Sequence, residues 1–588
     1  MVEGSTSPAT AAHVVTAEEL DMAGVETLAE ALDQVAGALT RMAGQGAARL
    51  DLRASRQRSA CVLLDGVPVS EPWGGSFDLA RVPVAAVESL RVVPGPPGET
   101  ALPGCPGGVV EVRLRDPEVA HGGDLRLEGG SGWSAALRAT SAGDLGGGAA
   151  LAALQATHRA FTTLPRDFVP MNAEDGGHRD LSDEDGVALL GGFVRRGARS
   201  SLNLGYHGLL SRHGVPPDAS MAPRFQRVAP LHREQLGLRW VATPRQDLSV
   251  AASLYGAGLR QDTARYTDAD TATWTWSESV RAGELGGATS VHASPRPGLR
   301  LGAGAAARLA GAQVHEQDTQ NAHSQQAGEG TWSAGAGVRL GPWRGSTTDL
   351  WVRACGPGGG SAVLACGRAE QRWRFGPGLA LRASGGRDAR APTLRERYDT
   401  TRGRPDLLPE VLEQVELGFE GAPGQVVAWD LTGWQVWSHG EINAPGDSDP
   451  FTNNPDARYA GLESAVFLRP GSVLRLRLAH TWTRVLEGTL DHVPEHRLVG
   501  AARVQGPWRL TLDADAAWLG ARTSGAVELA PYLVTGAQLG VELPRGWWAR
   551  LRVANTLDTL YEERALDPQP GRSLSLQVGG HWWTATTP

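Results

Sequence analysis

Residues 82–97 (VPVAAVESLRVVPGPP) and residues 104–115 (GCPGGVVEVRLR) mark the place where the character of this chain changes. Like residues 61–66 (CVLLDG), they are short apolar runs bounded by Gly or Pro, which are typical of buried strands in a compact domain. After residue 117, polar and apolar side chains alternate for about 460 residues, with frequent Gly and Pro turns and no predicted helix. We therefore predict a small α+β domain followed by a long series of β-hairpins.

The small domain is predicted to span residues 13–117. A Thr followed three residues later by Glu can form a capping box at the start of a helix, and this pattern occurs at Thr16 and at Thr27. Gly24 is placed to end the first helix. Strands are predicted over residues 13–15, 49–53, 61–64, 87–93 and 109–114, with a hairpin turn at Asp65 and Gly66.

The composition excludes several classes of protein. Hydrophobic residues make up 41% of the 588 residues, yet they form no apolar run near the roughly 18 residues that a transmembrane helix needs. The net charge of −8 gives a nucleic-acid partner no electrostatic support. Every basic residue other than His is Arg, which excludes a phosphate-binding loop that ends in Lys and any Schiff-base lysine. The sequence has no HExxH motif, no zinc-ligand spacing and no Gly-x-Ser-x-Gly, so neither an enzyme nor a bound cofactor is predicted.

The long second part, residues 124–583, is predicted to be a transmembrane β-barrel. Its alternating stretches, such as residues 235–241 (QLGLRWV), suit strands with one face in lipid and one in a hydrated lumen. Counting strands between the turns gives about 22. A soluble β-protein is the alternative, but the length of this part argues against it. Tight turns are predicted at residues 141–147, 243–246, 294–298, 341–344, 376–377, 470–472, 506–507 and 544–546.

Several Trp residues lie beside these tight turns. Trp side chains collect where a membrane meets water, so their position favours an aromatic girdle around the barrel. The predicted girdle consists of Trp343, Trp373, Trp508, Trp547 and Trp548.

Residues 13–117 resemble the plug domain of TonB-dependent outer-membrane receptors, especially those for vitamin B12 and siderophores. The matching stretches are VVTAEEL, ETLAEALDQVAG, ARLDLRAS, VLLDGVPV, AAVESLRVVPGP and GGVVEVRLRD, in the family's order. The later part has similar family-like motifs at residues 390–398 (RAPTLRERY), 403–413 (GRPDLLPEVLE), 453–463 (NNPDARYAGLE), 555–561 (NTLDTLY) and 570–573 (PGRS). The last strand is predicted over residues 571–583, with an aromatic end.

The resemblance implies a fold and a function. The fold is mainly β, an antiparallel barrel of about 22 strands with the plug inside its lumen, and tails at residues 1–12 and 584–588. The implied function is import of a scarce bulky nutrient (cobalamin, a ferric siderophore or a similar metal chelate) by TonB-driven displacement of the plug. The implied partners are an inner-membrane protein of the TonB type, the substrate and outer-membrane lipid. The resemblance also implies a monomer that is located in the outer membrane.

Two departures from the family keep an alternative open. Pro94 stands where the family usually carries an Arg that joins a network of plug–barrel ion pairs. Before His13 we recognise neither a TonB box nor the pattern of a signal peptide. The alternative is a passive channel or a non-transporting receptor of the same fold.

By the same resemblance, residues 71–77 (EPWGGSF) correspond to a loop at the plug apex that touches substrate. Trp73 would stack on the ligand, and Gly74 and Gly75 would let the backbone approach it. The predicted substrate contacts are Glu71, Trp73, Gly74, Gly75 and Ser76. The alternative for Trp73 is packing against the barrel wall. Residues 98–105 would form a second apical loop.

Two further sites are suggested by the residues themselves. The most acidic outer loop, residues 161–185, contains Asp175, Asp180, Asp183 and Asp185, which could bind Ca²⁺ through oxygen ligands; solvated acidic side chains are the alternative. Cys355 and Cys366 flank a Gly-rich tip and could form a disulfide in an oxidising compartment. Cys61 and Cys105 could pair inside the plug. For either pair, free buried thiols are the alternative.

Overall fold

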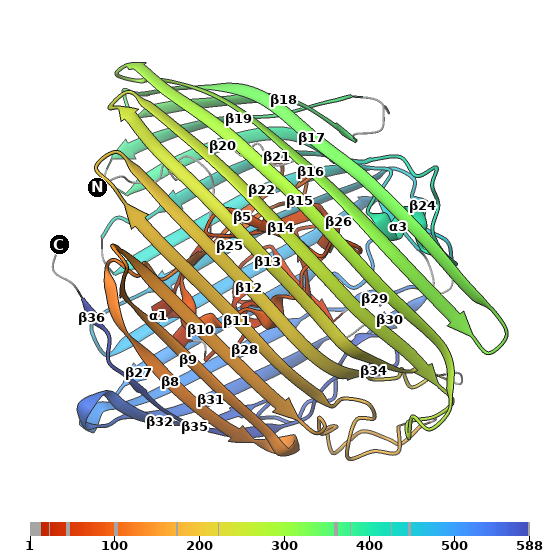
Figure 1. Ribbon diagram of the computed structural model, residues 1–588. Coiled ribbons are helices and arrows are strands. Elements are labelled where there is room, and N and C mark those ends of the chain that lie inside the picture. The colour runs from red at the N-terminus through yellow and green to blue at the C-terminus, as the bar shows by residue number, and fades with distance from the viewer. Residues whose placement is uncertain are drawn as a thin grey trace.

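A wide barrel closes around a small N-terminal domain that lies inside it, as the computed structural model shows (Figure 1). The structure describes residues 13–22, 24–42, 48–98, 104–171, 174–220, 223–357, 363–376, 378–424, 426–444 and 449–585.

The inner domain, the plug, is built on a five-stranded sheet in the order β1-β6-β7-β4-β5, in which β4 and β7 are parallel. A separate hairpin, β2–β3, lies outside this sheet. The predicted strands agree with those observed to within one or two residues, whereas β2 and β5 were not predicted. The elements are β1 (His13–Thr16), α1 (Ala17–Met22), α2 (Leu28–Asp33), β2 (Ala38–Met42), β3 (Ala48–Leu52), β4 (Ala60–Leu64), β5 (Val67–Val69), β6 (Val87–Pro94) and β7 (Gly108–Leu114).

Both predicted helices of the plug are present and capped at their starts. The Glu19 backbone N–H donates to the Thr16 hydroxyl, and the Glu19 carboxylate accepts from the Thr16 backbone N–H at 2.8 Å. At the second helix, the Thr27 hydroxyl accepts from the Glu30 N–H at 3.2 Å. There the Glu30 carboxylate accepts from the backbone N–H of Glu26 rather than of Thr27.

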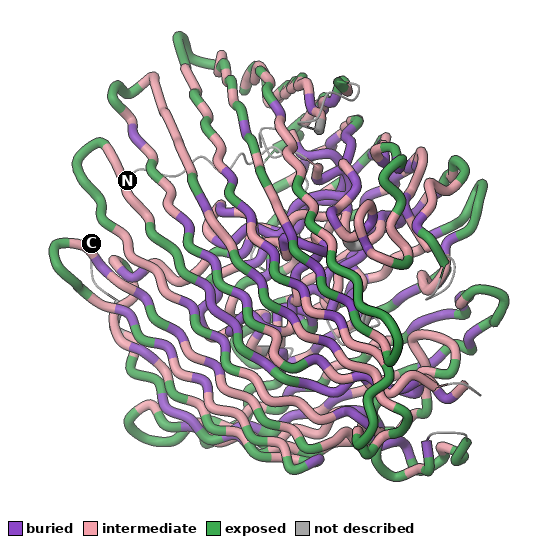
Figure 2. Tube along the Cα trace, turned by 45° about the vertical axis from the view of Figure 1, so that its right-hand side comes forward, coloured by how far each residue is buried: buried purple, intermediate pink, exposed green. Residues whose placement is uncertain are grey.

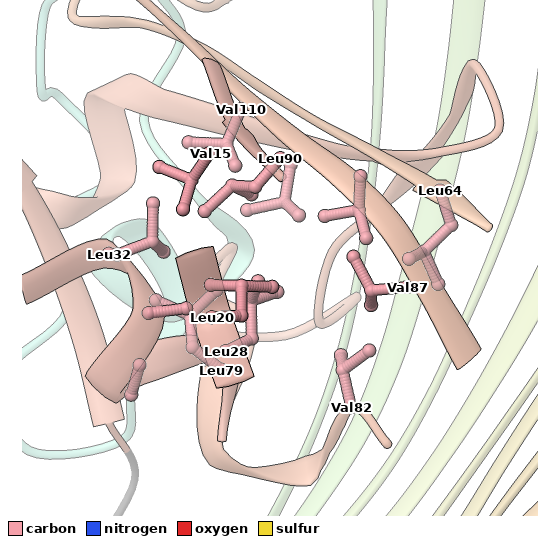
Figure 3. Packing of buried hydrophobic residues seen from close by; sticks show 14 of the residues in the cluster. Val15, Leu20, Leu28, Leu32, Leu64, Leu79, Val82, Val87, Leu90 and Val110 are labelled. Atoms are coloured by element: carbon pink, nitrogen blue, oxygen red, sulfur yellow. The ribbon is translucent and has the colours of Figure 1, made fainter. Parts of the chain in front are cut away.

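The plug has its own hydrophobic core (Figure 3). Leu20, Leu28 and Leu32 of the helices pack with strand residues such as Leu90 and Val110, and all five are buried. The same cluster includes Ala142, Leu151, Ala153, Leu190 and Ala501 of the barrel. The core is therefore continuous with the barrel wall, and the wall helps to position the plug.

The barrel contains the predicted 22 antiparallel strands, and β35 pairs with β8 to close it. A short segment, β36 (Thr584–Ala585), continues this pairing. The strands are β8 (Ala120–Gly130), β9 (Ser134–Leu145), β10 (Gly148–Arg159), β11 (Glu184–Arg196), β12 (Ser200–Val215), β13 (Phe225–Arg245), β14 (Leu248–Tyr266), β15 (Trp274–Arg296), β16 (Leu299–Asp318), β17 (Ala322–Trp343), β18 (Ser346–Pro357), β19 (Leu364–Gly376), β20 (Leu379–Arg390), β21 (Glu410–Gly421), β22 (Val427–His439), β25 (Ala457–Leu468), β26 (Leu474–Glu487), β27 (His496–Gln505), β28 (Leu510–Leu519), β31 (Tyr532–Glu542), β32 (Trp547–Ala554) and β35 (Ser573–His581).

Burial alternates along the barrel strands, as the colours of Figure 2 show, because successive side chains face the outside of the wall and the lumen in turn. On β13, Gln235 points inward and is 5% exposed, whereas its neighbour Leu236 points outward and is 61% exposed. Glu284 and Leu285 repeat this on β15. Apolar residues thus cover the outside, as a membrane requires, and polar residues line the lumen.

The two ends of the barrel differ. The predicted tight turns, of which Pro377 alone lies outside the described residues, connect strands at the end where the plug joins β8; we call this the turn end, and the other the loop end. The loops carry the hairpins β23–β24 (Ile442–Asn443, Thr452–Asn453), β29–β30 (Arg522–Ser524, Val527–Leu529) and β33–β34 (Glu562–Arg564, Asp567–Pro568). One loop also contains a helix, α3 (Leu394–Tyr398), so the prediction of no helix after residue 117 was wrong.

The predicted girdle needs one correction. Trp343, Trp373, Trp508 and Trp547 are exposed at the turn end, but Trp548 is only 4% exposed. Trp548 points into the lumen, where the guanidinium groups of Arg126 and Arg550 lie over its ring. Consecutive residues of a strand face opposite sides, so Trp547 and Trp548 cannot both lie on the outside. Among the described residues, no helix is long and apolar enough to cross a membrane.

The predicted turn at Asp65 and Gly66 joins β4 to β5 and gives a testable pH effect. Burial raises the pKa of Asp65 to about 6, although its carboxylate accepts from the Leu114 N–H at 3.0 Å. The usual pKa of Asp is about 4, so the unfolded chain loses this proton before the folded plug does. Protonation of Asp65 therefore stabilises the plug below about pH 4, and this contribution disappears as the pH rises through 6.

We expect Asp65→Asn to remove this contribution while keeping an acceptor for the Leu114 N–H. The stability difference between variant and wild type should be constant below pH 4, change in favour of the variant between about pH 4 and 6, and then level off. This stability difference would be measured at each pH by urea titration, with hydrogen exchange of β4, β6 and β7 as the readout of plug unfolding. A difference that does not depend on pH would contradict the expected titration.

Candidate functional site

A large cavity lies between the plug and the loops at the loop end. Its volume is about 1120 Å³. Loop residues on its wall include Pro217, Thr401, Asn443, His492, Ser524 and Gln569. The plug residues that line it are Arg41, Arg49, Arg56, Arg58, Ser59 and Arg81. The part of the plug that the structure describes thus brings five guanidinium groups and no carboxylate to the cavity.

Four of these arginines are neutralised by nearby carboxylates. Two of the partners belong to the plug itself and two to the loops, and one arginine also reaches a carboxylate at the end of a barrel strand. The pairs are Arg41–Asp51 at 2.6 Å, Arg56–Glu441 at 3.1 Å, Arg58–Glu396 at 2.8 Å and Arg81–Asp78 at 2.9 Å, with Glu184 as a second partner of Arg81.

Arg58 and Ser59 belong to a buried network that ties the plug apex to the barrel, which we call the outer contact. Glu396 accepts from Arg58 at 2.8 Å and from Arg390 at 2.8 Å. Glu410 accepts from Arg390 at 2.8 Å and from the Ser59 hydroxyl at 3.0 Å. The outer contact therefore joins the plug to the end of β20, the start of β21 and the helix α3 between them.

The sequence of α3 explains how Glu396 is positioned. Thr393 and Glu396 form a complete capping box: the Glu396 N–H donates to the Thr393 hydroxyl at 3.2 Å, and the Thr393 N–H donates to the Glu396 carboxylate at 2.7 Å. Burial acts to raise the pKa of Glu396, but the charges of Arg390 and Arg58 outweigh it and lower the pKa. Glu396 is therefore an ionised carboxylate that no solvent reaches.

A second network, the inner contact, lies deeper in the lumen. Arg53 of the plug donates to Glu416 of β21 at 2.9 Å and to both oxygens of Glu463 of β25 at 2.8 and 3.1 Å. All three side chains are buried. Gly37 lies against the Glu463 carboxylate, with a φ of +75°, and a Cβ there would be 2.2 Å from an oxygen of Glu463. Only glycine fits this close approach.

Near Pro94, an arginine of the barrel contacts the plug backbone. Arg368 of β19 donates to Glu416 at 2.8 Å and to the backbone carbonyl of Pro96 at 3.1 Å. Glu416 therefore has Arg53 from the plug on one side and Arg368 from the wall on the other. Plug–barrel ion pairs are therefore present through Arg53, whereas the pair of Arg368 with Glu416 lies within the barrel and Arg368 contacts the plug at a backbone carbonyl.

The predicted substrate loop is packed under the barrel wall and α3. Trp73 is 3% exposed and lies among apolar wall residues such as Val280 and Val314, beside Leu394 of α3. Its backbone carbonyl accepts from the Arg395 N–H at 3.0 Å. Packing against the wall, the alternative reading of Trp73, describes its position in this structure. Contact between Trp73 and a substrate stays a prediction, and it requires the loop to move.

The other residues of this loop are also largely covered by their neighbours. Gly75 has a φ of +74°, and a Cβ there would be 2.6 Å from Thr393. Gly74 and Ser76 are buried. Burial raises the pKa of Glu71, against the lowering effect of Arg49 and Arg395. Of the second apical loop, residues 98–105, only residues 98, 104 and 105 belong to the described part of the chain.

The predicted calcium site is not formed in the described part of the acidic loop. Asp183 pairs with Arg227 at 2.7 Å, and Asp185 pairs with Arg212 at 2.8 Å. Asp175 and Asp180 do not join them in a group with metal-ligand spacing. The four carboxylates are separated because arginines of neighbouring strands take two of them.

The four cysteines form two pairs. Cys61 is joined to Cys105 and Cys355 to Cys366, with Cα–Cα distances of 5.4 and 6.8 Å. Most of the tip between Cys355 and Cys366, residues 358–362, lies outside the described residues. Asp388 lies beside the second pair and is the third member of a possible metal-ligand group. Sulfurs joined to each other are not thiolate ligands, and Asp388 already pairs with Arg353 at 2.5 Å.

Comparison with known proteins agrees with this architecture. Residues 5–109 match the model of the TonB-dependent receptor plug domain, and residues 317–555 match that of the TonB-dependent receptor-like β-barrel. Together the two matches cover more than half of the chain. The chain belongs to the TonB-dependent receptor family. It is a protein of the outer membrane, which its strands cross.

Individual relatives of this receptor are distant. The vitamin B12 transporter BtuB of Photobacterium profundum is 23% identical over 480 residues, which cover 76% of this chain and 72% of that protein. The copper transporter OprC has the same fold, with a TM-score of 0.81, 14% identity and coverage of 97% of this chain and 98% of that one. A mutant of the ferric enterobactin receptor PfeA of Pseudomonas aeruginosa, in complex with enterobactin, has a similar fold. The TM-score is 0.77 and the sequence identity 16%, over 97% of this chain and 99% of that one.

The residues of the two contacts were not predicted, although signals for some of them exist. Arg53 and Glu463 lie inside stretches that resemble the family, ARLDLRAS and NNPDARYAGLE. Thr393 and Glu396 have the spacing of a capping box, which predicts the start of α3. Glu410 also lies inside such a stretch, GRPDLLPEVLE, whereas Glu416 carries no local signal, because its partners depend on the position of the plug in the lumen.

We expect Glu396→Gln to loosen the plug apex, because Arg58 and Arg390 would lose a buried counter-charge. Breaking a buried pair by removing one partner costs roughly 3–5 kcal/mol. Hydrogen exchange of plug residues 53–64 should become faster, while exchange of the barrel strands should not change.

Glu413→Gln is the matched control, since Glu413 pairs with Arg387 at 2.8 Å but both side chains are exposed. Such a pair contributes about 0–1 kcal/mol, so the control should behave like the wild type. Unchanged exchange of residues 53–64 in Glu396→Gln would show that the outer contact does not hold the plug.

Proposed function

We propose that this receptor imports a scarce, bulky nutrient, such as cobalamin, a ferric siderophore or a similar metal chelate, by TonB-driven displacement of the plug. The observation that carries this proposal is the cavity of about 1120 Å³ whose floor is the plug and whose walls are the loops. A ligand held there lies directly above the one domain that blocks the lumen.

The position of the plug's first strand fits a pull from the turn end. Asp21 of α1, just after β1, pairs with Arg503 at 3.1 Å and with Arg550, both near the tight turns. Burial acts to raise the pKa of Asp21, but the charges of Arg550 and Arg503 lower it to about 2. The N-terminal part of the plug therefore lies towards the side from which an inner-membrane partner of the TonB type would reach it.

The sheet order explains how such a pull could act. β1 is an edge strand that pairs with β6 over four residues, from His13 opposite Val92 to Thr16 opposite Ser89. A short edge strand can be detached without first breaking the centre of the sheet. β6 is the next strand in, so force on β1 is transmitted to the middle of the plug.

Relatives and composition give the proposed partners. The names of similar proteins include vitamin B12, ferric enterobactin and copper, so we propose a metal-containing substrate. We also propose that the exposed leucines of the wall contact outer-membrane lipid around a single chain, because one chain closes the barrel by itself.

Deleting the gene from its own host tests the proposal. Uptake of one radiolabelled substrate among cobalamin, ferric siderophores and copper chelates should fall to background, and a plasmid copy should restore it. Dissipating the proton-motive force should abolish the same uptake.

Uptake that survives loss of the proton-motive force would instead support a passive channel of the same fold. Binding without uptake would support a non-transporting receptor. Unchanged uptake of every substrate after deletion would contradict the proposal.

A further inference from the structure

Arg49 stands apart from the other arginines at the floor of the cavity. Among the described residues it has no carboxylate within ion-pair distance, whereas Arg41, Arg56, Arg58 and Arg81 each have one. Its Nε atom is fully covered and has no hydrogen-bond partner. Arg49 is half-buried and lines the cavity.

The strand register makes this charge harder to accommodate. Arg49 of β3 lies directly opposite Arg41 of β2 in the antiparallel hairpin. Side chains at such positions are on the same face, and like charges there destabilise the pair of strands. Asp51 neutralises Arg41 at 2.6 Å, but the described part of the plug offers no equivalent partner to Arg49.

The surroundings add positive charge. Burial, and next the charge of Arg58, lower the pKa of Arg49 to about 9; Arg395 and Arg41 act in the same direction. Glu71 is the carboxylate that opposes them. Arg49 is thus a half-buried guanidinium that lines the cavity and has no carboxylate at ion-pair distance among the described residues, so an anionic group of a bound ligand can fill that place.

We propose that Arg49 binds an anionic oxygen group, a carboxylate or catecholate, of the imported chelate, and that the receptor therefore prefers anionic metal chelates to neutral ones. This inference rests on the proposed function and names the substrate class of the same cavity. The four other plug arginines that line the cavity are paired with protein carboxylates, so Arg49 is the described plug guanidinium there without such a partner. Its planar fork of donors suits the paired oxygens of a carboxylate or catecholate.

Binding measurements on the full-length receptor in detergent test this inference. The probes are a trianionic iron(III) tris-catecholate, a neutral iron(III) trihydroxamate and cyanocobalamin, with affinity read from quenching of Trp fluorescence. We expect the wild type to bind the trianionic chelate most tightly, and Arg49→Gln to lose roughly tenfold to hundredfold of that affinity. Binding of the neutral probes should not change.

Two further variants separate charge from folding. Arg49→Lys keeps the charge but loses the planar fork, so its loss should be smaller than that of Arg49→Gln. Arg545→Gln removes an exposed arginine from a tight turn at the opposite end and should bind like the wild type. Since Arg49→Gln removes a like-charge contact, its thermal unfolding midpoint should equal or exceed that of the wild type.

The possible outcomes distinguish the two proposals. If Arg49→Gln binds the trianionic chelate as tightly as the wild type does, or if the wild type binds the neutral probes equally well, the anion preference is overturned and import can stand. If the wild type binds none of the three probes, the anion preference is overturned, whereas the proposed function is decided separately by the uptake measurements on the deletion strain.

Discussion

The whole arrangement depends on matching the polar lumen of a wide barrel with an equally polar plug. The outside of the wall must be apolar for lipid, and strand alternation then places the other half of the side chains in the lumen. Buried Glu and Arg residues such as Glu416, Glu463 and Arg382 face inward. A buried charge without a partner is costly, so the plug must bring groups that satisfy the wall. Arg53 of the plug satisfies carboxylates on two barrel strands, Glu416 of β21 and Glu463 of β25.

The same pairing holds the plug in place without fixing it permanently. Buried ion pairs lose much of their attraction to the cost of removing both charges from water, so a pair that separates into water loses little net free energy. Their directional geometry still defines one position. Arginine suits this role because one guanidinium donates along several directions, as Arg53 does to Glu416 and Glu463. Because the chain contains no lysine, ion pairs between a long basic side chain and a carboxylate are all made by guanidinium groups.

Local patterns predicted most of the fold. The capping box at Thr16, the N-cap at Thr27, the turn at Asp65 and the described tight turns of the barrel depend on neighbouring residues, and these were confirmed. The contacts between plug and wall could not be predicted, because they join residues far apart in the chain, such as Arg53 and Glu416, 363 residues apart. The position of Trp548, in contrast, could have been predicted from the sequence. Consecutive residues of a strand face opposite sides, so Trp548 cannot belong to the same outer girdle as Trp547.

The two contacts lie in an order that favours stepwise release. Both tie one short plug segment to β21: Arg53 binds Glu416, and Ser59 binds Glu410. Six residues of a strand separate the two glutamates, or about 20 Å. Glu416 is nearer the turn end, and Arg53 is nearer the N-terminus of the plug. In the proposed mechanism, a pull on β1 would load the inner contact before the outer one. Breaking the pairs in sequence needs less force than breaking them together, and the outer contact, beside the cavity, is the last to yield.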